Sequence, residues 1–236
     1  MLHLLYGAGG EGEKRPGSPD EIRTMDFQRT QVTAKGLKEL AGLKNLNTIY
    51  LSNDCLTDDT LWALREIGLL HALYICKARA GKRPAGPDDV TEMTFSWDDS
   101  RVKVTDAGVR ELAALRNLAS LNLSWTDVSD AGLKHLVGMK NLSSLWLRRT
   151  RVTGAGLRGL ARMKHLKALN THVTDDALKA LREADLLHLL PGPAGKEEKR
   201  KPTNADEVTK VDLWYTSVTG AGLKDLAPLR NLEPLK

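Results

Sequence analysis

The residues of this chain that could do chemistry are indole, phenol and guanidinium side chains, and their chemistry is recognition. Trp97 and Trp125 fall at one place in a recurring segment, Trp146 falls at another, and Arg148 and Arg149 follow Trp146 closely. Comparable places hold Tyr50, Trp214 and Tyr215. Exposed Trp, Tyr and Arg are enriched in the energetic hot spots of protein interfaces. We predict that these side chains form a binding surface; the alternative is that they only pack against one another on a strand face.

Groups suited to catalysis or metal binding lack the necessary spacing. The carboxylate pairs at 58–59 and 175–176 each follow a threonine, as acidic residues do at helix starts. His3, His71 and His188 each follow a leucine, but they lie too far apart along the chain to share a metal, so we expect structural histidines. The sequence therefore predicts no catalytic residue, metal site or cofactor.

The composition is that of an ordinary folded protein with a mild excess of basic residues. The chain has 236 residues, of which 41% are hydrophobic and only 5% aromatic, so Leu, Val and Ala must build the core. The formal net charge is +5. The basic pair Lys82-Arg83 and the run at 196–201, which Glu197 and Glu198 interrupt, lie in Gly/Pro segments, and we predict solvated loops there. Nucleic-acid binding through these loops is a weaker alternative.

Cysteine content and hydropathy bear on the compartment. Cys55 and Cys76 are too few for a disulfide scaffold and have no zinc-ligand spacing. No apolar run reaches the roughly 18 residues of a membrane span. The stretch at 1–7 is too short for a signal peptide. We expect a cytoplasmic protein, unless its true N-terminus is missing from the sequence.

A repeat of 24 residues must position all of these side chains. Leu118-x-x-Leu121-x-Leu123 recurs as the same pattern from Leu142, and each copy continues into a helical apolar spacing. Such a unit cannot bury its own apolar face, so successive units must stack into a solenoid. Counting the first apolar residue as position 1, the units begin at Ile22, Leu46, Val90, Leu118, Leu142, Leu166 and Val208.

Two polar positions and one glycine position of the unit have an expected physical role. The hydroxyl of Thr126, at position 9, is expected to satisfy a buried backbone group at the strand exit. Ser129, at position 12, is expected to cap a helix. Gly132, at position 15, indicates close approach between neighbouring helices. Trp62 lies in a helical segment and is predicted to be a core residue.

A larger repeat surrounds the first. Residues 57–71 match residues 174–188, and both copies lead into a Gly/Pro/Lys-rich stretch. We interpret residues 1–236 as a single array, a fragment of a longer one, interrupted at about 7–20, 77–89 and 191–207.

Two segments of this larger repeat are predicted to be unusually long helices. They span 58–76 and 175–190. Because short apolar runs do not separate helix from strand, a short helix followed by a strand at Leu70-x-x-Leu73-x-Ile75 stays open, and 69–76 and 186–190 are undetermined.

The pattern Thr-x-Val-Thr-Asp-x-Gly-Leu recurs along the chain, and residues 126–133 follow it with Ser129 in place of the second threonine. This pattern resembles that of the leucine-rich repeat proteins, and it is most similar to the cysteine-containing, ribonuclease-inhibitor-like subclass. The resemblance implies an α/β fold: a right-handed solenoid with parallel strands on the concave face and helices on the convex face. It also implies protein binding. Position 9 departs from the usual Asn or Cys, being Thr here and Asp54 in one unit.

The function we expect is a non-enzymatic scaffold that binds a protein partner on its concave sheet, without a cofactor or membrane. The alternative is a structural spacer within a larger repeat array. Related repeats occur in substrate receptors of ubiquitin ligases, but the chain has no F-box-like segment. We therefore give substrate recognition of that kind less weight.

Overall fold

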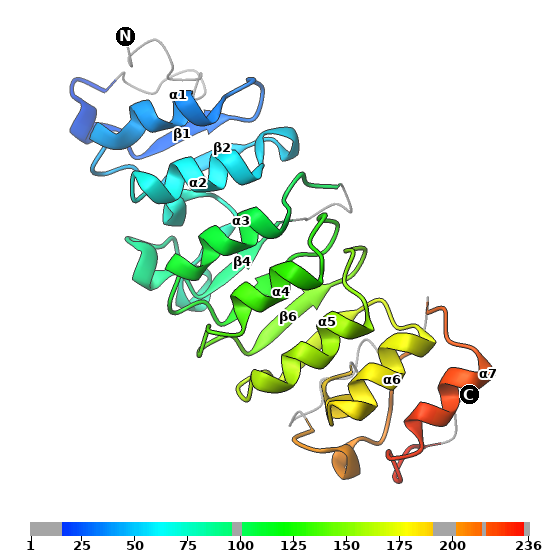
Figure 1. Cartoon of the computed structure of the whole chain (residues 1–236). Helices are drawn as coiled ribbons and strands as arrows, with labels where there is room; N and C mark the ends of the chain where they lie inside the picture. The colour runs from blue at the N-terminus through cyan, green and yellow to red at the C-terminus, as the bar shows by residue number, and fades with distance from the viewer. Residues whose placement is uncertain (1–15, 96–100, 191–201, 214–215, 234–236) are drawn as a thin grey trace.

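The computed structural model describes residues 16–95, 101–190, 202–213 and 216–233. Helices stack side by side along one face of the molecule, and the strands lie behind them (Figure 1). The strands are β1 (Thr24–Phe27), β2 (Thr48–Leu51), β3 (Cys76–Lys77), β4 (Glu92–Thr94), β5 (Ser120–Asn122), β6 (Ser144–Leu147) and β7 (Ala168–Thr171). The helices are α1 (Ala34–Lys38), α2 (Asp58–Glu66), α3 (Asp106–Glu111), α4 (Asp130–Leu136), α5 (Gly154–Gly159), α6 (Asp175–Glu183) and α7 (Gly220–Leu223).

Successive units pair in parallel and in register. Leu121 lies beside Leu145, which lies beside Leu169, so identical positions of neighbouring units are adjacent. Strands β4 to β7 follow one another in parallel in one sheet, and β1 pairs in parallel with β2 in another. The strand β3 is the exception, because it pairs antiparallel with β4.

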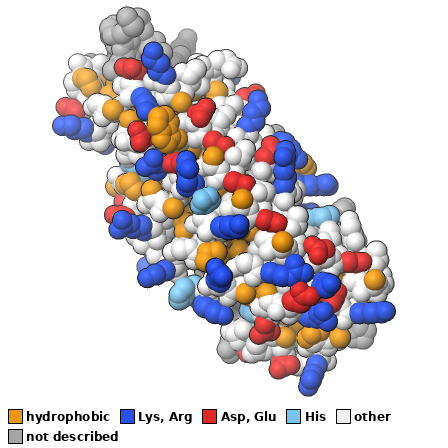
Figure 2. All heavy atoms as spheres, in the orientation of Figure 1, with side chains coloured by type: hydrophobic (Ala, Val, Ile, Leu, Met, Phe, Trp, Pro, Cys, Tyr) orange, Lys and Arg blue, Asp and Glu red, His pale blue; other side chains and the backbone are white. Residues whose placement is uncertain are grey.

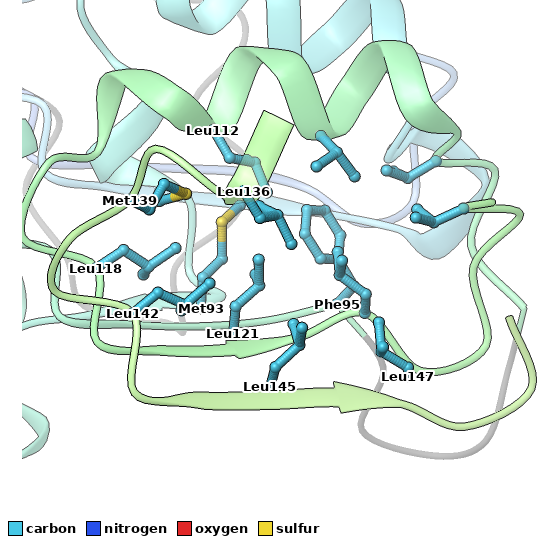
Figure 3. Close-up of a cluster of buried hydrophobic side chains, with 14 of the residues drawn as sticks. Met93, Phe95, Leu112, Leu118, Leu121, Leu136, Met139, Leu142, Leu145 and Leu147 are labelled. Carbon is cyan, nitrogen blue, oxygen red and sulfur yellow. The ribbon is translucent and has the colours of Figure 1, made fainter. Parts of the chain in front are cut away.

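The core lies between the strands and the helices, and it is built from the leucines that define the repeat. Leu121 and Leu145 are 0% and 1% exposed. Figure 3 shows their side chains pointing from β5 and β6 toward Leu112 and Leu136 on the helix side, with Phe95 between the two layers. The predicted solenoid with a shared apolar interior is confirmed.

The polar positions of the unit that begins at Leu118 have the predicted roles. The Thr126 hydroxyl donates to the Leu123 carbonyl oxygen at 2.6 Å, three residues back, at the strand exit. The Ser129 hydroxyl accepts from the backbone N–H of Ala131 and so caps α4. Equivalent hydroxyls cap the other α-helices.

The first carboxylate of four helices bonds to the next unit, which the helix-dipole interpretation of these residues had missed. Asp130 at the start of α4 accepts from the Thr153 backbone N–H at 2.7 Å and from its hydroxyl at 2.6 Å. Three further pairs repeat this arrangement: Asp58 with Thr105, Asp106 with Ser129, and Asp175 with Thr219. We call these four contacts the aspartate ladder.

The aspartate ladder explains why glycine recurs at position 15 of the unit. A Cβ added to Gly156 would overlap the carboxylate of Asp130, and the same holds for the glycines at position 15 of the other ladder units. Where the preceding helix begins without an aspartate, position 15 holds a larger residue: α5 begins with Gly154, and the next unit has Ala177 there. The predicted close approach is therefore correct, and the nearest atoms of the neighbouring helix are those of the aspartate carboxylate.

The predicted long helices over 58–76 and 175–190 are wrong. The helices α2 and α6 end at Glu66 and Glu183, because Gly68 and Asp185 take left-handed φ values of 75° and 58°. A backbone bond at each helix end, such as that from the Leu69 N–H to the Leu64 carbonyl, completes a Schellman-type stop.

The chain after α2 is closer to the alternative of a short helix followed by a strand. One 3₁₀ turn over Leu70–Ala72 leads to a parallel bridge between Leu73 and Ile49, and the strand β3 follows. After α6, a 3₁₀ turn spans Leu187–Leu189.

The loop containing Lys82 and Arg83 is not simply solvated, as its composition had indicated. The Arg83 guanidinium folds inward and donates to five backbone carbonyls, with N···O distances of 2.8–3.1 Å. The acceptors are the carbonyls of Asn47, Ala72, Leu73, Tyr74 and Cys76. Arg83 thus joins Asn47, just before β2, to the segment 72–76 that leads into β3.

The larger repeat has a structural counterpart where each Gly/Pro/Lys-rich stretch returns to a strand. Glu21, Asp89 and Glu207 each accept from a backbone N–H four residues earlier, at 2.8–3.1 Å. A 3₁₀ turn precedes the strand position in each case. The organisation of the whole chain as one array, and the right-handed sense of its coil, stay predictions.

Candidate functional site

The outward positions of the strands in the two sheets form the surface that we call the strand face. Position 5 of adjacent units brings Asp26 beside Tyr50 on β1 and β2, and Trp146 between Asn122 and Asn170 on β5 to β7. Because alternate side chains of a strand point to opposite sides, these residues lie opposite the buried leucines. Tyr50 and Trp146 are both half-buried.

Tyr50 belongs to an aromatic pair that the sequence had not revealed. Its ring stacks on Tyr74 with centroids 4.4 Å apart, and Tyr74 is 48% exposed. The Arg83 guanidinium lies 5.8 Å from the Tyr74 ring centroid. Tyr74 was missed because its segment was assigned to a helix; its place after Leu73, matching Tyr50 after Ile49, was the available signal.

Trp125 and Arg149 form a second cluster at the strand exits of neighbouring units. Both occupy position 8, and both have left-handed backbone φ values, 63° and 58°. The Arg149 guanidinium carbon lies 5.5 Å from the Trp125 ring centroid, which is a cation–π contact. Non-glycine residues pay about 1–3 kcal/mol for such a conformation, so the surrounding structure holds these two side chains in place.

Arginines surround this cluster. Asp127 accepts from Arg101 at 2.6 Å and from Arg151 at 3.0 Å, so one carboxylate joins three successive units. Arg148 and Arg149 are exposed, and among the described residues neither has a carboxylate within ion-pair distance. We call Trp125, Trp146, Arg148, Arg149 and Arg151 the arginine–tryptophan corner.

The predicted site residues therefore form two groups rather than one. Tyr50 lies in the β1–β2 sheet, whereas Trp125, Trp146, Arg148 and Arg149 lie at β5 and β6, with β3 and β4 between the groups. Trp97, Trp214 and Tyr215 lie outside the described residues.

The prediction that Trp62 is a core residue is wrong. Trp62 lies on α2, is 39% exposed, and has the Lys38 ammonium 3.7 Å above its ring centroid. It borders an open hollow of about 360 Å³ whose buried carboxylate, Glu111, pairs with Arg65 and Arg110. Figure 2 shows that basic and acidic side chains are interspersed over this helix-bearing side.

Groups that could support other chemistry are buried or dispersed. His71 is buried, and its Nδ1 lies 3.1 Å from the Gly68 carbonyl oxygen, which agrees with a structural role. Cys55 and Cys76 are free and buried, and desolvation raises the pKa of the Cys76 thiol to about 12. Within the described ranges, no three metal-ligating side chains gather, and no helix is long and apolar enough to cross a membrane.

Residues 114–137 match the family model described as Leucine Rich repeat. The chain folds as an α/β solenoid of stacked strand–helix units, and this segment of it matches the leucine-rich-repeat model. Internalin C2 of Listeria monocytogenes is 21% identical over 91% of this chain and 70% of its own, with a TM-score of 0.41. Internalin F of the same organism is 13% identical over 83% of this chain and 49% of its own, with a TM-score of 0.39. No curated protein matches the chain.

Proposed function

We propose that this protein is a non-enzymatic scaffold that binds a protein partner on its strand face. The aliphatic residues of the repeat are buried in the core of the solenoid. Four aromatic side chains lie on the strand side instead: Tyr50, Tyr74, Trp125 and Trp146. A leucine-rich-repeat solenoid offers an extended surface of this kind, since each unit contributes one strand to it.

The observation that carries the proposal is the conformation of Trp125 and Arg149. Glycine would occupy both positions without strain, yet the chain has a tryptophan and an arginine there. Strained residues persist where the rest of the structure over-determines them, and they cluster at binding sites. These two side chain types are also the ones most enriched in interface hot spots.

Selection of peptides from a randomised display library against the full chain tests the proposal. Binding of the selected peptides is then measured to the wild type, to Trp146→Ala, and to Trp62→Ala as the matched aromatic control on the helix side. Because a hot-spot tryptophan contributes about 2 kcal/mol or more, we expect Trp146→Ala to weaken binding at least tenfold and Trp62→Ala to leave it unchanged.

Two results contradict the proposal. One is the selection of peptides whose affinity depends on Trp62 and not on Trp146. The other is that none of the selected peptides binds Trp146→Ala more weakly than it binds the wild type. Thermal unfolding of each variant separates a loss of binding from a loss of folding.

A further inference from the structure

We infer that the arginine–tryptophan corner binds an acidic polypeptide segment, one that presents Asp or Glu carboxylates to Arg148 and Arg149. This inference rests on the proposed function and specifies the partner's chemistry at one part of the strand face. It is carried by charge, by geometry and by the contrast with the rest of the molecule.

Among the described residues, positive charge is in excess at the corner. Asp127 pairs with Arg101 and Arg151, and no described carboxylate pairs with Arg148 or Arg149. Asp98 and Asp99 lie outside the described residues and do not enter this comparison. The remaining guanidinium groups, on Arg148 and Arg149, are exposed and available to a ligand.

The side-chain chemistry of the corner suits carboxylates. Guanidinium groups bind carboxylates through two parallel hydrogen bonds, and Arg148 and Arg149 are adjacent in the chain. Trp125 is half-buried and lies against Arg149, which limits the freedom of that side chain before binding. An ordered arginine loses less conformational entropy when a ligand arrives.

The positive charge is local, and this favours a short acidic segment over a nucleic acid. The strand face carries exposed carboxylates in other units, including Asp26 and Glu92. A polyphosphate chain following the strands would meet these negative charges, whereas a segment with a few carboxylates can be confined to the corner. The helix side has no comparable excess, since its charges are interspersed (Figure 2).

Fluorescence titration with three defined probes tests the inference. The probes are a short labelled peptide in which glutamate alternates with glycine, the same peptide with glutamine in place of glutamate, and an oligothymidine of equal length. The variant is Arg148→Glu/Arg149→Glu. The control is Lys140→Glu/Lys164→Glu, which makes the same change in net charge at exposed residues between helices and strands.

We expect the glutamate peptide to bind the wild type and the lysine control equally. The affinity should fall at least tenfold in the arginine variant, and it should weaken as salt rises because exposed charges are screened. Since Arg149 has a left-handed backbone, thermal unfolding must show that the variant is folded. Arg148→Gln/Arg149→Gln provides a milder change that removes the charges without reversing them.

Three results overturn the inference: equal binding of the glutamate and glutamine peptides, equal loss in the lysine control, or tighter binding of oligothymidine through the same arginines. The proposed function can hold even if this inference fails. If library-selected peptides depend on Trp146 but carry no acidic residues, the strand face binds proteins and only the acidic specificity is wrong.

Discussion

At the scale of single residues, Arg149 and Trp125 hold their side chains in place with a strained, left-handed backbone conformation. Replacing Arg149 with glycine removes the left-handed strain, worth about 1–3 kcal/mol, and also a cation–π contact worth about 0.5–1 kcal/mol. We therefore expect Arg149→Gly to raise the free energy of unfolding by about 1 kcal/mol, measured by urea denaturation, and to lose affinity for acidic peptides. A destabilised Arg149→Gly variant would show that the arginine has a structural role.

His71 makes the stability depend on pH. Burial is the main cause that lowers its pKa from the ordinary value, so the folded state holds the ring neutral. Because the folded pKa lies below the unfolded pKa of about 6.5, the stabilising effect is complete above that pH and is lost as the pH falls through the folded value. We expect the wild type to lose more stability than His71→Gln between neutral pH and pH about 5. Equal acid sensitivity in urea denaturation would contradict this.

The sequence predicted individual side chains well where the repeat is regular. The buried leucines, the capping hydroxyls and the strand-face placement of Trp146 follow from the 24-residue period. It failed for Trp62 and Tyr74, because exposure within an irregular unit depends on where a helix ends rather than on periodicity. The left-handed conformations of Trp125 and Arg149 had no signal, since neither residue type favours them.

At the scale of elements, neighbouring helices are joined by carboxylates that contact glycines. Gly156→Ala should cost about 1–3 kcal/mol, because the added methyl group overlaps Asp130. Gly159→Ala, in the same helix, meets nothing within 4 Å and should be neutral or stabilising. Denaturant unfolding of both variants measures the difference.

Removal of the carboxylate shows whether Asp130 is the cause. In an Asp130→Ala background, the cost of Gly156→Ala should shrink by about 1 kcal/mol or more, as coupling between contacting residues requires. One pair of neighbouring helices already lacks both the aspartate and the glycine. The helix α5 begins with Gly154 instead of aspartate, and α6 has Ala177 at position 15. Additive effects of the two substitutions would show that the glycine is required for another reason.

Arg83 supplies hydrogen-bond donors to the backbone of the irregular unit that includes β3. Arg83→Gln would leave several partly buried carbonyls without donors, and we expect a loss of about 2–4 kcal/mol in the free energy of unfolding. Lys82→Gln is the control, because this neighbouring side chain is exposed. Equal urea midpoints for the two variants would rule out the proposed role of Arg83.

At this scale, the sequence predicted the existence of helices and strands better than it predicted the residues at which they end. The segments 58–76 and 175–190 contain enough leucine for long helices, but Gly68 and Asp185 stop them through backbone conformation. The aspartate ladder was also missed. A helix-start acid is explained by the helix dipole alone, and only the stacking of two units shows that the same carboxylate bonds to the next cap.

At the scale of the whole molecule, each unit contacts mainly its neighbours. Contacts between neighbouring units therefore fix the positions of the strands that form the strand face. The Asp127 carboxylate, held by Arg101 and Arg151, and the aspartate ladder fix neighbouring units at the level of side chains. The repeat period was sufficient to predict this architecture. It was insufficient to predict that β3 and β4 separate the predicted binding residues into two groups.

Oxidative footprinting of tryptophan side chains, with and without a bound peptide selected from the library, tests the central claim most directly. Each tryptophan reports on its own surface by the rate at which hydroxyl radicals modify it, and Trp62 on the helix side is an internal control. We expect bound peptide to slow the oxidation of Trp125 and Trp146 and to leave Trp62 unchanged. Protection of Trp62 with unchanged oxidation of Trp125 and Trp146 would contradict the claim that the strand face binds the partner.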